Sequence, residues 1–447
     1  MTELKLPAPV RQLIAQLEQA GYETCAVGGC VRDCLLSRVP DDWDLCTAAP
    51  PEQILSLFAD CRPIPTGQAH GTVTVPIGGI LCEITPFRTE SGYADGRHPD
   101  QVLFGCTLEE DLARRDFTIN AMAYHPVRSL IDPFGGRRDL QDGLLRCVGD
   151  PFRRFSEDAL RLLRGARFLA VFGLTAEAGT AAALHDLSST VVRASHERLL
   201  PELLKLLCAP QAARALSEFS DLLFALVPEL AEQKDFPQHN PHHHLDIWRH
   251  TLAVLSAVPP EPALRLAALL HDAAKPLCAT VDADGVSHFK GHPARGAEMA
   301  DAILRRLRCS NALREEVVSL VLLHDERTKP DLPAVRRLMA KLPPARLDAL
   351  FALQRADVAG QAPDSREAKY ARISAVEALT HRILEQKLCC SLPQLAVSGD
   401  DLLALGVSKG PGVGQLLHRL LDAVIDEELE NDRELLLRQA ARWLSEP

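Results

Sequence analysis

The sequence predicts an α+β protein: a small N-terminal part with a mixed or antiparallel sheet, followed by a long all-helical remainder. Three observations support this fold class. Alternating β-branched residues are concentrated before residue 150, whereas leucine and alanine recur at helical spacing from about residue 155 onward. At 447 residues the chain is also too long for one compact core, so we expect several domains.

The elements of the predicted sheet follow one another closely. After a first amphipathic helix, we predict strands at 22–29 and 42–47 and a hairpin around a glycine pair at 71–87. Short helices are expected at 30–38, at 51–60 and at the start of 108–124. The polar segment 88–105 shows no periodicity and is predicted to be a loop.

Two breaks divide the helical remainder. One contains prolines and lies at 231–246, and the other lies at 387–395. We therefore predict four domains, at 1–145, 146–235, 236–385 and 386–447.

Composition narrows the functional classes. No apolar run approaches the roughly 20 residues that span a bilayer, so we expect no membrane association. The 13 cysteines form no C-x-x-C pair, which argues against a zinc knuckle or a disulfide framework and favours reduced thiols in a cytoplasm. The net charge of −11 is unfavourable for a nucleic-acid partner, but basic runs concentrate arginine locally. The oligomeric state is left open.

Two carboxylates lie two residues apart in the segment DDWDLCT, at Asp42 and Asp44. Residues two apart in a strand face the same side, so these carboxylates project together while Trp43 turns into the core. Such neighbours repel unless a cation neutralises them, and paired Mg²⁺ ions held this way serve phosphoryl transfer. A plain polar strand face fits the same pattern. Glu83, on a later strand, fits either a third ligand or an outward-facing residue.

Six motifs follow one another along the chain: VGGCVRDCLL, DDWDLCT, PTGQAHGTV, CEITPFR, RRDFTINAMAY and EDALRLLRGARF. Their order over about residues 20–210 resembles that of class II CCA-adding enzymes, tRNA nucleotidyltransferases of the polymerase-β-like superfamily. The resemblance implies a nucleotidyltransferase head at 1–145 and a neck at 146–235 for base selection and RNA binding. It also implies Mg²⁺ as the cofactor of the head, and tRNA, CTP and ATP as partners.

The resemblance implies a role for each matching residue. Asp42 and Asp44 match catalytic, metal-binding aspartates, with Glu83 as a further candidate ligand. Nucleotide binding is implied for Gly28, Gly29, Arg32, Arg115, Asp116, Asn120, Asp158, Arg161 and Arg164. Within this set Asp158 and Arg161 match the residues that read the base, and Glu157 is expected to position Arg161.

The chemistry of the bases fits the pair Asp158 and Arg161. Cytosine and adenine each present an amine donor beside a ring-nitrogen acceptor, so one carboxylate and one guanidinium can bind either base. Guanine and uracil present the opposite polarity. We expect the two residues one helical turn apart on one face, a spacing that an i,i+3 surface ion pair would also show.

Histidines and aspartates recur inside apolar helical runs between residues 240 and 360. The order of His250, His271, Asp272 and Asp357 resembles that of the HD phosphohydrolase superfamily. The resemblance implies that these residues hold a divalent metal for phosphate-ester hydrolysis. His292 and His324 match positions that bind a second metal or a phosphate in some members. Domain 236–385 is thus predicted to be an HD domain, either active or retained for its shape.

The predicted function is template-independent addition of CCA to tRNA 3′ ends, with the helical tail at 386–447 contacting tRNA. A bacterial poly(A) polymerase and partial CC- or A-adding enzymes are alternatives, because they share the head. Two segments favour full CCA addition. PTGQAHGTV stands where the polymerases usually carry a basic stretch, and TESGYADGRHP fills a loop that CC-adding forms lack.

Overall fold

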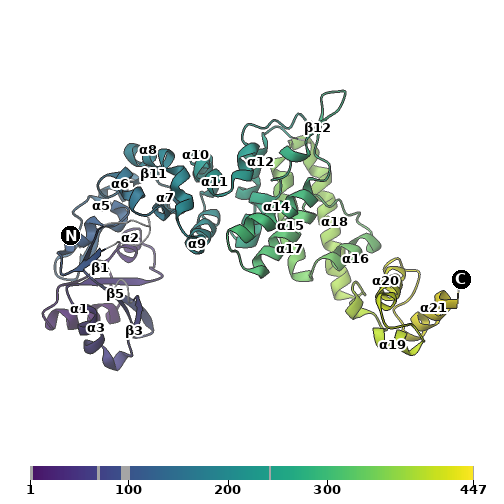
Figure 1. Cartoon of the computed structure of the whole chain (residues 1–447), viewed down its shortest axis with the longest axis horizontal. Helices are drawn as coiled ribbons and strands as arrows, with labels where there is room; N and C mark the ends of the chain where they lie inside the picture. Colours follow the sequence, from purple (N-terminus) through teal and green to yellow (C-terminus); the bar gives the residue numbers. More distant parts are fainter. Residues whose placement is uncertain (1–3, 68–70, 92–100, 241–242, 446–447) are drawn as a thin grey trace. The chain divides into compact units, whose positions relative to one another are not determined.

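The computed structural model describes residues 4–67, 71–91, 101–240 and 243–445. The chain divides into two compact units, 1–228 and 229–447. The predicted α+β class is confirmed: strands dominate only the N-terminal part, and helices follow to the end of the chain (Figure 1). The finer division into four domains stays a prediction.

The first unit is built on a seven-stranded mixed sheet in the order β3-β4-β5-β2-β1-β8-β9. Its strands are β1 (Thr24–Val27), β2 (Trp43–Thr47), β3 (Ile64–Gly67), β4 (Thr72–Ile77), β5 (Ile80–Pro86), β8 (Ala123–His125) and β9 (Ser129–Ile131). Strands β2 and β5 run parallel, with Asp44 opposite Glu83, and the other neighbouring pairs run antiparallel.

Helices cover both faces of this sheet. α1 (Ala8–Gln19), α2 (Gly29–Leu35) and α3 (Pro51–Leu57) pack their apolar residues into the same core as Trp43 and Leu45. On the other face, α4 (Leu108–Ala113) shares a core with Cys46. Trp43 is buried, as predicted. Because neighbours in a strand alternate, Asp44 faces the α4 side of the sheet.

The prediction of a loop at 88–105 was wrong for the residues that the structure describes. β6 (Arg88–Ser91) and β7 (Gln101–Phe104) pair antiparallel, with Arg88 opposite Phe104. A two-stranded ribbon is held by backbone hydrogen bonds and needs no apolar face, so its sequence carries no period-two signal. Residues 92–100, most of TESGYADGRHP, lie outside the described residues, as do 68–70 of PTGQAHGTV.

The first unit continues as packed helices after α5 (Gly136–Asp142). They are α6 (Pro151–Glu157), α7 (Leu160–Phe172), α8 (Ala178–Asp186), α9 (His196–Leu207), α10 (Ala212–Glu218) and α11 (Ser220–Leu226), with a short parallel pair of β10 (Leu144–Leu145) and β11 (Thr175–Ala176). Phe117, which follows α4, lies 6.3 Å from Phe155 and 5.6 Å from Phe168 between ring centroids. These aromatic contacts pack α6 and α7 against the sheet part.

The second unit is helical apart from the hairpin of β12 (Thr280–Val281) and β13 (Ser287–His288). Its helices are α12 (Ile247–Ala257), α13 (Pro262–Leu270), α14 (His292–Arg306), α15 (Asn311–Leu323), α16 (Leu332–Lys341), α17 (Pro344–Gly360), α18 (Arg366–Glu385), α19 (Gly399–Ala404), α20 (Pro411–Ile425) and α21 (Arg433–Ser445). Short 3₁₀ helices of the whole chain lie at Ala59–Cys61, Thr118–Asn120, Ser188–Arg193, Pro228–Gln233, Pro276–Cys278, Pro363–Ser365 and Leu392–Gln394.

None of the helices in the described ranges has the length and apolarity that crossing a membrane requires.

The last three helices form a core of their own, which one arginine joins to α16. Arg336 is buried and donates to the carbonyl oxygen of Cys389 from Nε and Nη2, at 2.9 and 2.6 Å. Its Nη1 donates to the carbonyls of Val424 at 2.9 Å and Ile425 at 3.2 Å. Those two carbonyls belong to the last turn of α20, where helix geometry leaves acceptors without intrahelical donors.

Replacing this arginine tests whether it holds the tail. Arg336→Ala removes the side-chain donor of the Cys389 and Ile425 carbonyls and one of the two donors of the Val424 carbonyl, so we expect the free energy of unfolding in urea to fall by about 3 kcal/mol. The matched control is Arg337→Ala, which removes the neighbouring, exposed ion pair to Asp426 and is expected to cost less than about 1 kcal/mol. Equal effects of the two substitutions would contradict the role of Arg336 in holding the tail.

Candidate active site and metal centre

A tight turn between β1 and α2 forms one wall of a pocket in the first unit. Gly28 has φ of +77°, in the left-handed region that favours glycine, and its backbone N–H donates to the Met122 carbonyl at 3.0 Å. A Cβ at Gly28 would stand 2.9 Å from Nη1 of Arg115. Glycine at position 28 therefore lets an arginine approach the backbone closely.

Asp42 and Asp44 flank Trp43 at the start of β2. Asp42 is exposed and Asp44 is half-buried, and no ion pair joins either carboxylate to any of the described residues. The pKa of Asp44 is raised to about 6, mainly by burial and also by the charges of Glu83 and Asp42, while Arg115 opposes them. Three carboxylates that destabilise one another fit a cation, since a bound metal would relieve the repulsion.

The neighbouring arginines are tied to other carboxylates. Arg164 donates to Oδ2 of Asp116 from Nε at 2.9 Å and from Nη2 at 2.7 Å, and Asn120 donates to Oδ1 at 3.1 Å. Burial alone would raise the pKa of Asp116, but the Arg164 charge and these hydrogen bonds hold it well below its usual range. Arg32 Nη1 donates to Asn120 Oδ1 at 2.6 Å, which extends the network to α2.

Arg115 belongs to the same wall and pairs with Asp111 of α4. Its Nη2 lies 3.2 Å from Oδ2 of that buried carboxylate. Because both partners are anchored in the core beneath the sheet, the guanidinium stays beside Gly28 and Asp44.

The residues predicted to read the base lie where α6 meets α7. Glu157 accepts from Arg161 Nη1 at 2.8 Å, as expected for a residue that positions Arg161. Asp158 is extended, with φ of −144°, and lies in a break between the helices. The expectation that Asp158 and Arg161 share one helical face was therefore wrong. The Asp158 carboxylate accepts the Leu160 backbone N–H at 3.1 Å, which competes with continuation of the helix.

These walls enclose a pocket of about 520 Å³. Its lining includes every nucleotide-binding residue predicted from the sequence, together with both aspartates. The lining residues are Gly28, Gly29, Arg32, Asp42, Asp44, Arg114, Arg115, Asp116, Asn120, Asp158, Leu160, Arg161, Arg164, Arg167, Phe168 and Arg198. Glu83 is not among them; it is exposed and lies beside Asp44 in the strand register. Arg198 was missed, because nothing in its local sequence distinguishes it from a solvated helix residue.

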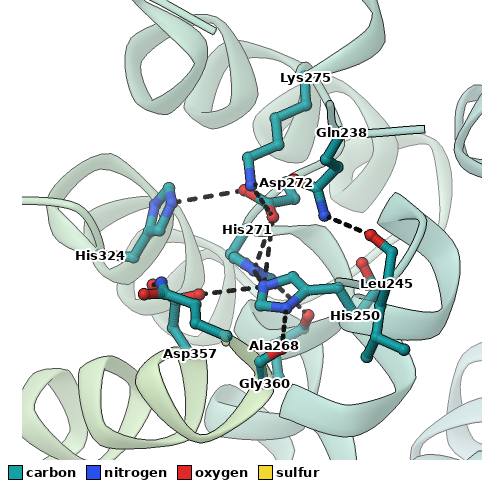
Figure 2. A network of polar contacts seen from close by, with 12 residues as sticks. Gln238, Leu245, His250, Ala268, His271, Asp272, Lys275, His324, Asp357 and Gly360 are labelled. Carbon is teal, nitrogen blue, oxygen red and sulfur yellow. Dashed lines mark hydrogen bonds and ion pairs between the residues drawn. The ribbon is translucent and has the colours of Figure 1, made fainter. Parts of the chain in front are cut away.

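A second cluster of candidate ligands lies inside the second unit, where Figure 2 shows His250, His271 and Asp357 pointing toward one another. His250 Nε2 lies 3.0 Å from Asp357 Oδ1 and 3.3 Å from His271 Nε2. Two groups of potential ligand atoms share Asp272, one with His250 and His271 and the other with His292 and His324. All five residues of these two groups are buried.

All four histidines present the same ring nitrogen to the cluster. Their Nδ1 atoms lie 2.7 to 3.2 Å from backbone carbonyls, which can only accept, so Nδ1 carries the proton. Nε2 is then left with a lone pair directed at Asp272 and Asp357. Histidine ligands of metals are oriented in this way, so the donor set fits a divalent transition metal.

Charge around Asp272 is balanced by basic groups. Burial alone would raise the pKa of Asp272, but His271, when it carries a second proton, and Lys275 hold it well below its ordinary value. Lys275 Nζ lies 2.7 Å from Asp272 Oδ2 and donates to Gln238 at 3.0 Å (Figure 2). The adjoining pocket measures about 500 Å³ and also takes in Asp357, His292 and His324.

Comparisons with known proteins bear on the first unit and on the chain as a whole. Residues 24–146 match the family model of the poly A polymerase head domain, 173–234 a probable RNA- and SrmB-binding site of polymerase A, and 295–440 a putative tRNA nucleotidyltransferase domain 2. The CCA-adding enzyme of Limosilactobacillus fermentum is 33% identical over 444 residues, which cover 98% of both chains. This chain belongs to the CCA-adding enzymes.

Other CCA-adding enzymes support that membership. The enzyme of Anoxybacillus flavithermus is 32% identical over 95% of this chain and 94% of its own. The crystal structure of the Bacillus stearothermophilus enzyme in complex with CTP superimposes with a TM-score of 0.73 at 30% identity, over 98% of this chain and 97% of that one. The membership predicted from the motifs is confirmed. The likeness to HD phosphohydrolases is not tested by these relatives and stays a prediction.

Stability as a function of pH tests the electrostatics of Asp44 in the metal-free enzyme. Because the folded-state pKa is raised, its contribution to stability is present at low pH and lost as the pH rises through about 6. Asp44→Asn removes the cost of ionisation, which builds up between pH 4 and pH 6, so we expect it to increase the free energy of unfolding by about 2 kcal/mol near pH 8 and by much less near pH 4. Urea unfolding with EDTA measures both values.

Asp41→Asn is the matched control for this prediction, because it changes an exposed carboxylate just before the same strand. We expect little change at either pH. Destabilisation by Asp44→Asn near pH 8 would contradict the repulsion inferred at this site.

Proposed function

We propose that this chain adds CCA to the 3′ end of tRNA, using CTP and ATP as substrates and the pocket of the first unit as the active site. The observation that carries the proposal is the arrangement of charge in that pocket. Asp42 and Asp44 have no ion-pair partner among the described residues, while seven arginines line the same space. Carboxylates that bind metal beside cations that bind phosphate are what nucleotidyl transfer requires.

The two aspartates would hold Mg²⁺, with Glu83 beside them on the neighbouring strand. Bound there, the metal supplies activation of the tRNA 3′-hydroxyl and stabilisation of the leaving pyrophosphate. The two aspartates would fix the place of the metal. Asp44 is held by β2, and Asp42 lies one residue before the strand. Most of the metal's shell would then be left to phosphate oxygens.

The opposite wall would bind the triphosphate. Arg32, Arg115 and Arg164 are each held by an amide or a carboxylate, so their guanidinium groups are oriented before a nucleotide arrives. Gly29 would add its backbone N–H at the start of α2, whereas the Gly28 N–H already donates to the Met122 carbonyl. Pre-oriented donors lower the reorganisation that charge transfer would otherwise require.

Asp158 and Arg161 would select the base, by accepting from its amine and donating to its ring nitrogen. No nucleic-acid template is needed, because the protein pair offers the complementary edge to both cytosine and adenine. Asp116 and Asn120 would act mainly through Arg164 and Arg32. A cytoplasmic location, expected from the cysteine pattern, stays a prediction.

Incorporation assays test this function against its alternatives. With a tRNA that lacks its 3′ CCA, we expect CTP alone to add two residues, ATP alone to add none, and both together to add three and stop. A poly(A) polymerase would extend with ATP alone, and a CC-adding form would ignore ATP. Gel analysis of labelled tRNA separates the three outcomes.

The Asp42→Ala, Asp44→Ala double variant links the activity to the pocket. We expect incorporation of both nucleotides to fall roughly a thousandfold, because the metal loses its protein ligands. Asp41→Ala, in the same segment, is expected to retain activity. Unchanged incorporation by the double variant would rule out the proposed mechanism.

A second candidate function belongs to the second unit, and the uniform orientation of its four histidines favours it. We propose that His250, His271, Asp272 and Asp357 hold a divalent metal for hydrolysis of a phosphate ester, with His292 and His324 available to a second ion or a phosphate. Water activated at such a metal is the nucleophile of this reaction class.

A glycine substitution tests the metal site without removing a ligand. Gly360 accepts from His250 Nδ1, and a Cβ on it would stand 2.7 Å from that same atom. Gly360→Ala must therefore displace His250, and we expect loss of bound Mn²⁺ after dialysis and loss of 2′,3′-cyclic nucleotide hydrolysis. Asp272→Ala should give the same result.

Gly296→Ala serves as the matched control, since its Cβ would meet no atom closer than 3.4 Å. It should retain metal, and CCA addition should persist in all three variants. Metal retention by Gly360→Ala would contradict the ligand role of His250. A parent protein that binds metal but hydrolyses nothing would leave the domain without the proposed activity.

A further inference from the structure

Arg198 lies in the first turn of α9, 40 residues after the base-reading segment, yet its guanidinium meets Asp158. Nη2 donates to Oδ2 at 2.7 Å and Nη1 lies 3.3 Å from Oδ1, so the two planar groups face each other side by side. Both side chains are largely covered, Arg198 being 29% and Asp158 15% exposed. Neither the family motifs nor the sequence assigns Arg198 a role.

Asp158 needs such a partner because its backbone does not fix it. The residue is extended and lies between two helices, so its carboxylate is held only by side-chain interactions and by the Leu160 N–H. Among the described residues, Arg198 is the one side chain that hydrogen-bonds to this carboxylate. Without it, the plane of the carboxylate would be free to rotate.

The hydrogen bonds also distinguish the two carboxylate oxygens. Oδ1 accepts from Leu160 and Arg198, which uses both of its lone pairs. Oδ2 accepts from Arg198 alone among the described residues, which leaves one lone pair for a ligand. The exocyclic amine of cytosine or adenine is the donor that this lone pair would take.

Arg161, the other residue of the base-reading pair, is held by a partner of the opposite charge to the one that holds Asp158. Arg161 donates to Glu157 Oε2 at 2.8 Å and to the carbonyls of Arg154 and Arg114 at 3.0 and 3.2 Å. The acidic Glu157 thus orients the base-reading guanidinium, and the basic Arg198 orients the base-reading carboxylate. Each group of the base-reading pair is therefore held by a partner of opposite charge.

We propose that Arg198 is a positioning residue for nucleotide selection, and that it sets the preference of this enzyme for CTP and ATP over UTP and GTP by fixing the Asp158 carboxylate. The proposal rests on the proposed function, in which Asp158 accepts from the base. A guanidinium suits the task because its planar fork fixes the plane of a carboxylate, which the point charge of lysine does not.

Steady-state kinetics of Arg198→Ala and Arg198→Lys, with each of the four nucleotides and a tRNA lacking CCA, tests the proposal. We expect KM for CTP and ATP to rise about tenfold in Arg198→Ala, and the preference for CTP over UTP to fall about tenfold, with kcat for CTP changing much less. Arg198→Lys should show the same changes in KM and in preference, but smaller.

Arg214→Ala is the matched control, since this arginine of α10 donates to Gly173 and Thr175. The preference of Arg214→Ala for CTP over UTP should equal that of the parent protein.

A double-variant cycle separates positioning from general support of the fold. In an Asp158→Asn background, Arg198→Ala should cause no further loss of preference, because the group that it positions is already altered. An equal loss of activity with all four nucleotides, or a further loss of preference in the Asp158→Asn background, would overturn the proposal.

If Arg198→Ala does not fold, the kinetics of Arg198→Lys decide the question. A parent protein that incorporates neither CTP nor ATP refutes the proposed function, whereas an active parent with unchanged preference in both variants refutes this inference alone.

Discussion

The pocket of the first unit brings carboxylates and guanidinium groups close together, but only some of them form ion pairs. Seven arginines and four aspartates line it. Asp116 pairs with Arg164, Asp158 pairs with Arg198, and Asp111 beneath the wall pairs with Arg115. The first two pairs join residues from separate segments of the chain, and the third is an i,i+4 pair. Asp42 and Asp44 are left outside this pairing, and the pKa of Asp44 is raised by burial and by the neighbouring carboxylates, with Arg115 acting against them.

The aspartates without an arginine partner and the arginines held by carboxylates are suited to different tasks. A carboxylate without a guanidinium partner can give its lone pairs to a metal, whereas a guanidinium already held by a carboxylate presents its remaining N–H groups in a fixed direction. The β2 strand is central to the separation, because its alternation puts Trp43 into one core and turns Asp44 to the opposite face. The second unit places imidazole ligands around a carboxylate instead. There, backbone carbonyls accept hydrogen bonds from Nδ1–H, so the neutral imidazoles can lie around Asp272 with their Nε2 lone pairs inward.

Much of the pocket could be predicted from the sequence, partly because its candidate metal and phosphate residues lie at a strand start and a helix start that local patterns indicate, and largely because its motifs resemble those of class II CCA-adding enzymes. The D-x-D spacing and the glycine turn at 28–29 are of this kind. Asp158 could not be placed correctly: it belongs to a helical pattern, but its carboxylate captures a backbone N–H and breaks the helix. Arg198 could not be found at all, since the contact that gives it meaning is with a residue 40 positions away. The same holds for Gly360, whose importance lies in a carbonyl and a missing Cβ.

The central claim is that Asp44, which pairs with no arginine among the described residues, has a raised pKa, so that near pH 6 the binding of metal and nucleotide displaces a proton from it. Calorimetry of Mg²⁺–CTP binding near pH 6, in two buffers of different ionisation enthalpy, measures this directly because the buffer dependence of the binding heat counts protons released. We predict that the parent protein releases roughly half a proton more per CTP bound than Asp44→Asn does, in keeping with a pKa of about 6. Equal proton release by the two proteins would show that Asp44 is already ionised before the metal arrives, and would contradict that claim.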